Sequence, residues 1–279
     1  MTQPSSDFLR FHHQPALSEA TLVLAFSGWM DGGDVSTGTV RRLVDLLEAR
    51  PIAEIDPEPF FIYNSPGSME VAALFRPRIE IADGLIKSIE MPAATFYCHE
   101  AANLILFVGK EPNLRWNTFA NCVLELARVA AVRDILFVGS FGGSVPHTRE
   151  PRLHVTCSSS DMLPEMERYA LRRTAYEGPG SFASYLLTRV PSAGLRMASL
   201  AAEIPGYLQG PNPVCIEAVT RRLAKILRLP LDLAPLRAAS TEWELAVSAA
   251  IEKDEEMMQQ VRQMEEAYDN ELLQLGEGA

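Results

Sequence analysis

One stretch near the start of the chain, residues 21–47, joins three patterns in immediate succession. An apolar run, Leu22–Phe26, stops at a glycine-rich turn, and a helical pattern begins at once over Val35–Leu47. The order strand, glycine loop, helix is the unit from which parallel α/β sheets build ligand crevices. The stretch therefore predicts where a site should lie, at the carboxyl end of a strand, and leaves open what the site does.

Strand and helix patterns alternate along most of the remaining sequence. The runs Leu104–Val108 and Ile135–Val138 are continuously apolar, which is typical of strands covered on both faces. Between them, Arg115–Ala131 carries apolar residues at three-to-four spacing, the period of an amphipathic helix. We therefore expect an α/β protein, a three-layer α/β/α sandwich around a largely parallel or mixed sheet.

Two smaller predictions concern a middle region of the chain. Phe60–Tyr63 is apolar and favours a further strand. Arg78–Ile81 and Leu85–Ile89 flank the short sequence Ala82-Asp83-Gly84, whose glycine suits a tight turn. We therefore expect a β-hairpin over these two runs.

The chain divides by pattern into three parts. We expect residues 1–19 to form an irregular N-terminal arm, residues 20–238 the α/β/α core, and residues 239–279 a long acidic C-terminal helix. The formal net charge is −11, and residues 252–279 hold nine acidic and two basic side chains, so they account for −7 of it. The rest of the chain carries only −4, which is ordinary for a globular domain.

The C-terminal part also carries a heptad pattern, which lies within residues 241–273. The positions that step by four and three in turn are Trp243, Val247, Ala250, Asp254, Met257, Val261, Met264 and Tyr268. Asp254 is the one flaw in this apolar seam. Two interpretations stay open: a projecting helix that packs on a partner or another subunit, or a terminal helix docked on its own domain.

Composition excludes several classes of protein. No apolar run approaches the roughly 18 residues of a membrane span, and the N-terminus lacks the pattern of a signal peptide. The four cysteines show no CxxC spacing, which favours reduced thiols over a metal site or a disulfide framework. Without a basic stripe, nucleic-acid binding is not expected. We expect a cytoplasmic protein with no metal, no cofactor and no membrane partner.

The glycine loop after the first strand is the first candidate site. Gly33, Gly38 and Thr39 have the spacing of a phosphate loop, but the lysine that should precede Thr39 is missing, which argues against a nucleotide triphosphatase. Backbone N–H groups here favour an anion; the alternative is a tight turn that lets strand and helix pack closely. Asp31 or Asp34 suits the helix N-cap. The candidate ligand-binding residues are Gly28, Trp29, Asp31, Gly32 and Gly33.

Two further strand ends carry polar residues. Arg115 could clamp an anion or pair with Glu111. Ser140 lacks the flanking pattern of a nucleophile elbow, and His147 is a weak candidate for a general acid or base. Strand ends of an open α/β sheet line a common crevice. The candidates there are Glu111, Arg115, Gly139, Ser140, Gly142, Gly143 and His147, and no catalytic residue is assigned.

Five segments resemble, in order and spacing, the proteasome assembly chaperone 2 family as it occurs in prokaryotes. They are AFSGWMDGGDVSTG, EPNLRWNTFANCVLELA, GSFGGSVPHTR, GPGSFASYLL and MEEAYDNEL, and the resemblance spans Thr21 to Leu273. It implies a core similar to nucleoside phosphorylases and related hydrolases, added C-terminal helices, and the self-association and protein-binding role of the eukaryotic and archaeal relatives. Relatives that bind proteasomes can use a tail of hydrophobic residue, tyrosine and any residue, whereas this chain ends Gly276-Glu277-Gly278-Ala279.

Two function hypotheses follow. The first is a self-associating homo-oligomer with an assembly-chaperone-like role, whose protein partner binds through residues 241–273. The alternative is a small-molecule-binding enzyme or sensor with an anion site at the carboxyl ends of the strands. In that case Arg115 would bind the anion and His147 would move a proton.

Overall fold

The structure, a computed structural model, describes residues 7–276 and is built around one nine-stranded sheet, with a separate two-stranded sheet beside it. The strands of the large sheet are β1 (Leu9–Phe11), β2 (Ala20–Ser27), β3 (Arg50–Ile55), β6 (Ala94–His99), β7 (Leu104–Lys110), β8 (Val132–Gly143), β9 (Leu153–Cys157), β10 (Arg172–Arg173) and β11 (Arg196–Pro205). Their order across the sheet is β1-β3-β6-β7-β2-β8-β11-β9-β10. The central strands β7, β2, β8 and β11 are parallel, while β3, β6 and β9 pair antiparallel, so the sheet is mixed.

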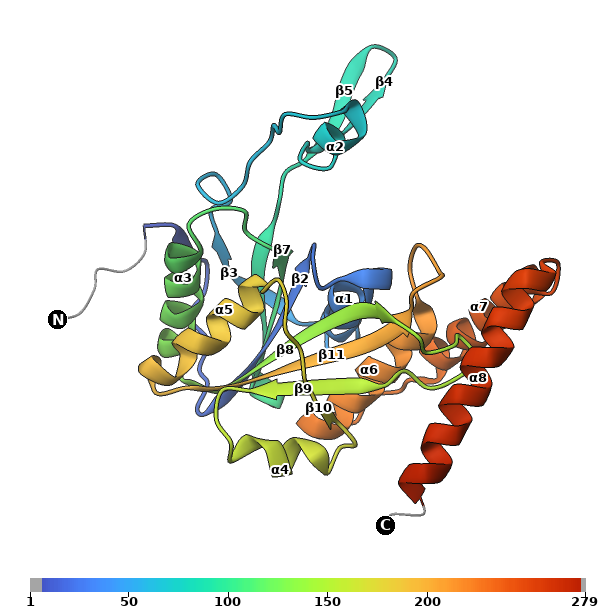
Figure 1. The fold of residues 1–279 in the computed structure, drawn as a ribbon. Helices are drawn as coiled ribbons and strands as arrows, with labels where there is room; N and C mark the ends of the chain where they lie inside the picture. Colours follow the sequence, from blue (N-terminus) through green and yellow to red (C-terminus); the bar gives the residue numbers. More distant parts are fainter. Residues whose placement is uncertain (1–6, 277–279) are drawn as a thin grey trace.

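Helices cover both faces of this sheet (Figure 1). Those on one face are α3 (Trp116–Val129) and α5 (Phe182–Arg189), and those on the other are α1 (Val35–Leu46), α4 (Met162–Glu167) and α6 (Pro213–Leu227). Three further helices, α2 (Met69–Ala73), α7 (Ala234–Ile251) and α8 (Glu255–Gly276), lie away from the faces of the sheet. Side chains alternate along β2, so Leu24 and Phe26 pack with α3 and α5, while Val23 and Ala25 pack with α1 and α6. The predicted three-layer α/β/α sandwich is confirmed.

Two local predictions fail in the N-terminal half. The irregular arm predicted over residues 1–19 is wrong for part of residues 7–19, the ones that the structure describes, because β1 adds an edge strand to β3, with Leu9 opposite Ile55. Phe60–Tyr63 is not a strand: the Phe60 carbonyl accepts the backbone N–H groups of Asn113 and Leu114, at 2.9 and 3.0 Å. Phe60 is fully buried, its ring centroid 5.0 Å from that of Phe119. The apolar pattern there reflects a buried loop.

The predicted single C-terminal helix is divided into α7 and α8, between which the chain turns sharply (Figure 1). The break falls at Asp254, the flaw in the heptad seam. Its carboxylate accepts the backbone N–H of Met257 at 3.1 Å, which satisfies a free donor at the start of α8. The residue that interrupts the apolar pattern is therefore an N-cap.

A segment between β3 and β6 projects from the sandwich; we call residues 64–92 the arm (Figure 1). It contains α2 and the hairpin of β4 (Arg78–Ala82) and β5 (Leu85–Glu90). The hairpin predicted from the sequence is confirmed, with Gly84 at φ +73° in its turn. Because β3 and β6 pair directly, the arm is an insertion in the connection between two neighbouring strands of the sheet.

Candidate functional site

The β2–α1 loop forms a tight polar turn at the carboxyl end of β2. The Asp31 carboxylate accepts two hydrogen bonds from Thr37, from its backbone N–H at 3.0 Å and from its hydroxyl at 2.8 Å. Burial raises the pKa of Asp31 to about 6, although the hydrogen bonds from Thr37 lower it. Asp34 stands at the N-cap position of α1 but its side chain makes no capping bond, and the Asp31 carboxylate accepts the free N–H of Thr37 in its place.

The glycines of this loop allow close packing. A Cβ on Gly32 would lie 2.9 Å from Ile204 Cδ1, and one on Gly33, whose φ is +63°, would lie 2.9 Å from Asn212 Cβ. The Gly33 carbonyl accepts the backbone N–H of Asn212 at 2.8 Å. Gly28, at φ +128°, passes close to Glu111. These contacts support the tight-turn interpretation, and an anion in this loop remains a prediction.

Ser140 and its neighbouring glycines lie at the carboxyl end of β8, against the same loop. The Ser140 backbone N–H donates to the Met30 carbonyl at 2.8 Å, and its hydroxyl donates to the Gly32 carbonyl at 2.7 Å. Ser140 is fully buried. Its polar atoms thus hold the loop to the sheet. The neighbouring glycines Gly139, Gly142 and Gly143 lie within the strand β8.

Glu111 ties together two segments that meet at the end of β7. One carboxylate oxygen accepts the backbone N–H of Phe182, the first residue of α5, at 2.6 Å, and the other accepts that of Trp29 at 3.2 Å. The predicted alternative of an ion pair with Arg115 is therefore wrong. Arg115 is exposed at the start of α3 with φ +53°, and the Trp29 side chain is 62% exposed.

A buried carboxylate that the sequence reading missed lies at the end of β11. Glu203 is only 8% exposed; it accepts the Ser144 backbone N–H at 2.8 Å and lies 3.3 Å from an Arg152 nitrogen and 3.9 Å from His154 Nε2. Burial opposes ionisation, but these neighbours lower the pKa of Glu203 to about 2. A Cβ on Gly143 would overlap its carboxylate. The signal was available, since Glu203 is a charged residue flanked by the apolar residues Ala202 and Ile204 in the strand.

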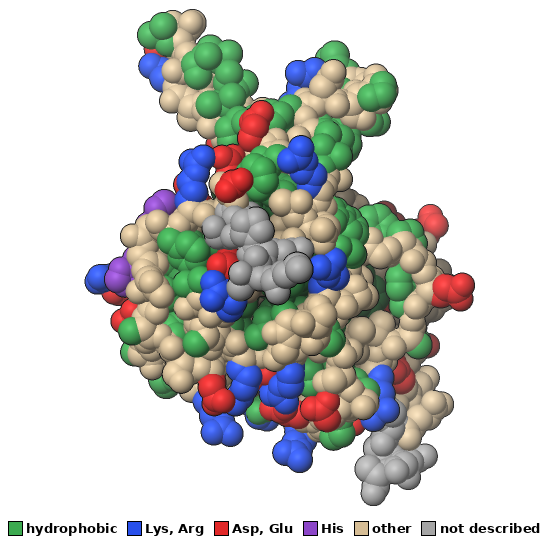
Figure 2. Space-filling view, turned by 90° about the vertical axis from the view of Figure 1, so that its left-hand side faces the viewer, with side chains coloured by type: hydrophobic (Ala, Val, Ile, Leu, Met, Phe, Trp, Pro, Cys, Tyr) green, Lys and Arg blue, Asp and Glu red, His purple; other side chains and the backbone are tan. Residues whose placement is uncertain are grey.

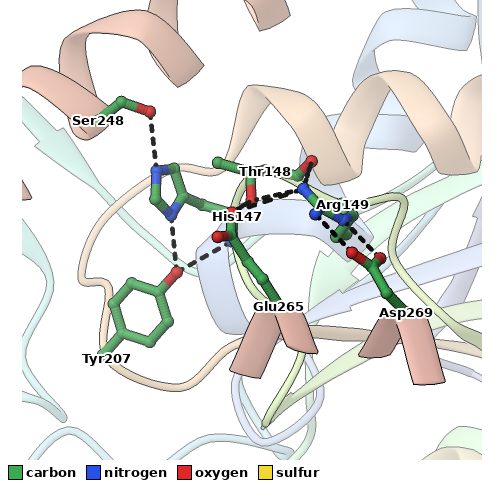
Figure 3. Close-up of polar contacts among 7 residues, drawn as sticks. All are labelled: His147, Thr148, Arg149, Tyr207, Ser248, Glu265 and Asp269. Carbon is green, nitrogen blue, oxygen red and sulfur yellow. Dashed lines mark hydrogen bonds and ion pairs between the residues drawn. The ribbon is translucent and has the colours of Figure 1, made fainter. Parts of the chain in front are cut away.

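His147 sits between the core and α7 (Figure 3). Its backbone N–H donates to the Tyr207 hydroxyl oxygen at 2.9 Å, its Nδ1 lies 2.7 Å from the same oxygen, and its Nε2 lies 3.1 Å from the Ser248 hydroxyl. These contacts are satisfied when Tyr207 donates to Nδ1 and Nε2–H donates to Ser248. Burial lowers the pKa of His147, against the charge of Glu265, so the neutral ring is favoured.

The residues after His147 hold α8 (Figure 3). The Thr148 hydroxyl donates to Glu265, and Arg149 makes two parallel bonds to Asp269, at 2.9 and 2.8 Å. The Arg152 guanidinium lies 4.5 Å from the centre of the Tyr268 ring. We call residues 147–152, with their partners on β11, α7 and α8, the latch.

The latch decides between the two interpretations of the heptad seam. Val261 and Tyr268, both seam positions on α8, are buried, and the Tyr268 hydroxyl donates to the Glu150 carbonyl at 3.0 Å. α8 is therefore docked on its own domain. The sequence predicted His147 near a ligand site. It could not show that its partners would be Tyr207 and Ser248, which lie 60 and 101 positions further along the chain.

The arm, unlike α8, presents apolar side chains that remain exposed. Its hairpin places Ile79 opposite Ile89 and Ile81 opposite Ile86, so four isoleucines share one face, and each is between 46% and 66% exposed. Figure 2 shows hydrophobic side chains on the projections at the top of the molecule. Further exposed apolar residues of the arm are Met69, Val71, Leu74, Leu85 and Met91.

Other classes of site can be checked within the described residues. Between residues 7 and 276, none of the helices has both the length and the apolar character to cross a membrane. In the same part of the chain, no group of three or more histidine, cysteine, aspartate or glutamate side chains is placed to hold a metal ion.

Comparison with known proteins gives a consistent set of relatives. The model of the PAC2 family matches residues 25–251. A proteasome-assembly chaperone homologue from Mycobacterium tuberculosis is 29% identical, with a TM-score of 0.74 over 86% of this chain and 99% of that one. A PAC2 family protein from Streptomyces avermitilis is 26% identical, with a TM-score of 0.72 over 87% and 99%.

A more distant structure shares the fold. An archaeal proteasome activator from Pyrococcus furiosus is 18% identical, with a TM-score of 0.64 over 87% of this chain and 97% of that one. No curated protein matches the chain.

Proposed function

Because the chain belongs to the PAC2 family, we propose that it is an assembly-chaperone-like protein that binds other proteins and associates with itself. The Mycobacterium tuberculosis relative, named a proteasome-assembly chaperone homologue, supports the chaperone-like role. The enzyme or sensor alternative gains no such support, because Ser140 and His147 direct their polar side-chain atoms to groups of the protein itself.

The observation that carries self-association is the uncovered apolar face of the arm. A two-stranded hairpin on its own is marginally stable in water, since one pair of strands buries little apolar surface. Here the isoleucines Ile79, Ile81, Ile86 and Ile89 line one face, while Glu80 and Ser88 form a cross-strand pair of the opposite character. A second copy of the chain supplies the cover that this face lacks.

The proposed chaperone-like role also requires client proteins, which bind in addition to the second copy of the chain. The relative's name makes proteasome subunits the first class of client to test. The C-terminal tail, which lacks the hydrophobic-tyrosine pattern, ends in residues 277–279, outside the described residues. A client surface within 241–273 remains part of the proposal: on α7 no side chain is buried, and Leu245 is 66% exposed.

We place the protein in the cytoplasm. The four cysteines, all in the described part of the chain, form no disulfide with one another. Burial raises the pKa of Cys98 and Cys157 to about 11 and that of Cys215 to about 12, so these thiols stay protonated and poorly reactive. Such thiols suit a reducing compartment.

Sedimentation equilibrium on the full chain tests self-association. We expect a mass that is a multiple of 30.8 kDa, and loss of that assembly in the double variant Ile81→Asp, Ile89→Asp, whose charges cannot be buried in an apolar contact. The control is Ser88→Lys, which adds one charge to the same hairpin opposite Glu80 without touching the isoleucine pairs. A monomeric wild-type protein, or equal dissociation by the control, would refute the proposal.

A further inference from the structure

A pocket of about 330 Å³ lies where the arm meets the core. We call it the basal pocket. Four cations line it, and they come from both parts of the molecule: Arg41 from α1, Lys110 from the end of β7, and Arg76 and Arg78 from the arm. Such a grouping cannot be seen in the sequence, where Arg41 and Lys110 stand far from the other two.

The net charge of the residues that line the basal pocket is positive, opposite in sign to the net charge of the whole chain. Glu90 is the one carboxylate among its lining residues, so cations exceed anions by three, whereas the chain carries a net charge of −11. None of the four cations forms an ion pair with a carboxylate of the described residues; Arg76 donates one hydrogen bond, of 3.2 Å, to the Asn64 side chain. Like charges brought together repel, and a cleft of one sign concentrates ligands of the other.

The chemistry of these side chains specifies the ligand class. A guanidinium presents a planar fork of donors that matches phosphate oxygens, and a lysine adds a compact charge. Ser27, at the end of β2, also lines the pocket. The volume is at the lower end of the range for small-molecule sites, about 300–1,000 Å³. We propose that the basal pocket binds a small polyanion that carries phosphate groups.

The position of the pocket gives this binding a structural consequence. Two cations belong to the core and two to the arm, so one ligand would bridge both parts. A ligand that prefers the docked arrangement stabilises it in proportion to its occupancy. Binding would therefore hold the arm, and the apolar hairpin it carries, in a fixed orientation on the core.

Isothermal titration with sodium tripolyphosphate at constant ionic strength tests the site. Arg41→Gln and Arg78→Gln should each weaken binding by about tenfold or more, since each removes a charge-assisted contact. Matched controls are Arg42→Gln, the next residue on α1, and Lys87→Gln on β5; both are exposed and neither lines the pocket. We expect both controls to bind like the wild type.

Hydrogen exchange on the same proteins tests the bridge. Tripolyphosphate should slow exchange of backbone amides in the arm of the wild-type protein and leave the arm of the Arg41→Gln variant unchanged. Absence of saturable binding, or an equal loss in pocket and control variants, would overturn the proposal, because it would show attraction to surface charge alone. Binding without slowed exchange in the arm would overturn the bridging role.

Discussion

The latch and the arm are two regions that differ in where their side chains find partners. In the latch, both ring nitrogens of His147 and the guanidinium of Arg149 bind groups of the same chain. On the arm, four isoleucines share a face that nothing in the described chain covers. The contrast teaches that the side chains of the latch find their partners within one molecule, whereas the isoleucine face of the arm finds no cover among the described residues.

We expect the largest loss of stability from a substitution in the latch, at Arg152. This side chain is 11% exposed and bridges Glu203, at 3.3 Å, and Glu271, at 2.5 Å. Arg152→Ala leaves Glu203 buried without its cation, and removing one partner of a buried pair costs about 3–5 kcal/mol. We expect a loss of that order in the free energy of unfolding from urea titration. The control is Arg173→Ala, whose pair with Glu167 is exposed; an equal small loss in both variants would contradict the latch as a buried network.

A second test of the latch uses acid. The pKa of Glu203 in the folded chain is about 2, below its ordinary value of 4.5. A lowered acid pKa stabilises the fold above the unfolded value, and this contribution is lost as pH falls from about 4.5 toward 2; its size is on the order of 3 kcal/mol. Urea titrations between these pH values should show a shallower loss of stability in Glu203→Gln than in the wild type. Parallel curves would contradict the assignment.

A smaller pH effect should come from His147. Burial lowers its pKa in the folded protein, so the unfolded chain takes up the proton first and stability falls as pH drops below about 6.5. In His147→Gln this part of the pH dependence should disappear. Thermal melts from neutral to mildly acidic pH would measure it; an unchanged slope in the variant would assign the titration to another group.

We expect the smallest change in stability from substitutions on the isoleucine face of the arm. Ile81→Asp with Ile89→Asp alters exposed positions, so the free energy of unfolding of the monomer should change by less than about 0.5 kcal/mol. Urea titration at a protein concentration low enough to keep both proteins monomeric would measure this. A loss as large as that of Arg152→Ala would mean that the isoleucines stabilise the core of their own molecule.

The fold was predictable where the signal is local. Leu22–Phe26 and the glycines after it predict a strand, a turn and a helix, because these residues interact with near neighbours in the sequence. The heptad positions Val261 and Tyr268 gave the buried face of α8 correctly. Asp254 was read as a flaw in the seam, because an acidic residue in a helical pattern looks the same whether it is exposed or caps a new helix.

The site was less predictable, because its contacts join distant residues. Nothing near His147 in the sequence identifies Tyr207 and Ser248 as its partners. The four cations of the basal pocket come from a helix, a strand end and the arm. Glycine-rich strand ends predicted a crevice, yet Gly32 and Gly33 pack against Ile204 and Asn212, since the same residue type serves both close packing and ligand approach.

Because β3 pairs directly with β6, the arm can be replaced without changing the sheet. These strands are antiparallel neighbours, and a turn of about two to five residues normally suffices to join such a pair. The core therefore does not need residues 64–92 to close its sheet, and surface insertions of different length cost little in loop entropy. Evolution, or a protein engineer, can exchange this segment for another and redirect what the molecule meets while leaving the sandwich as it is.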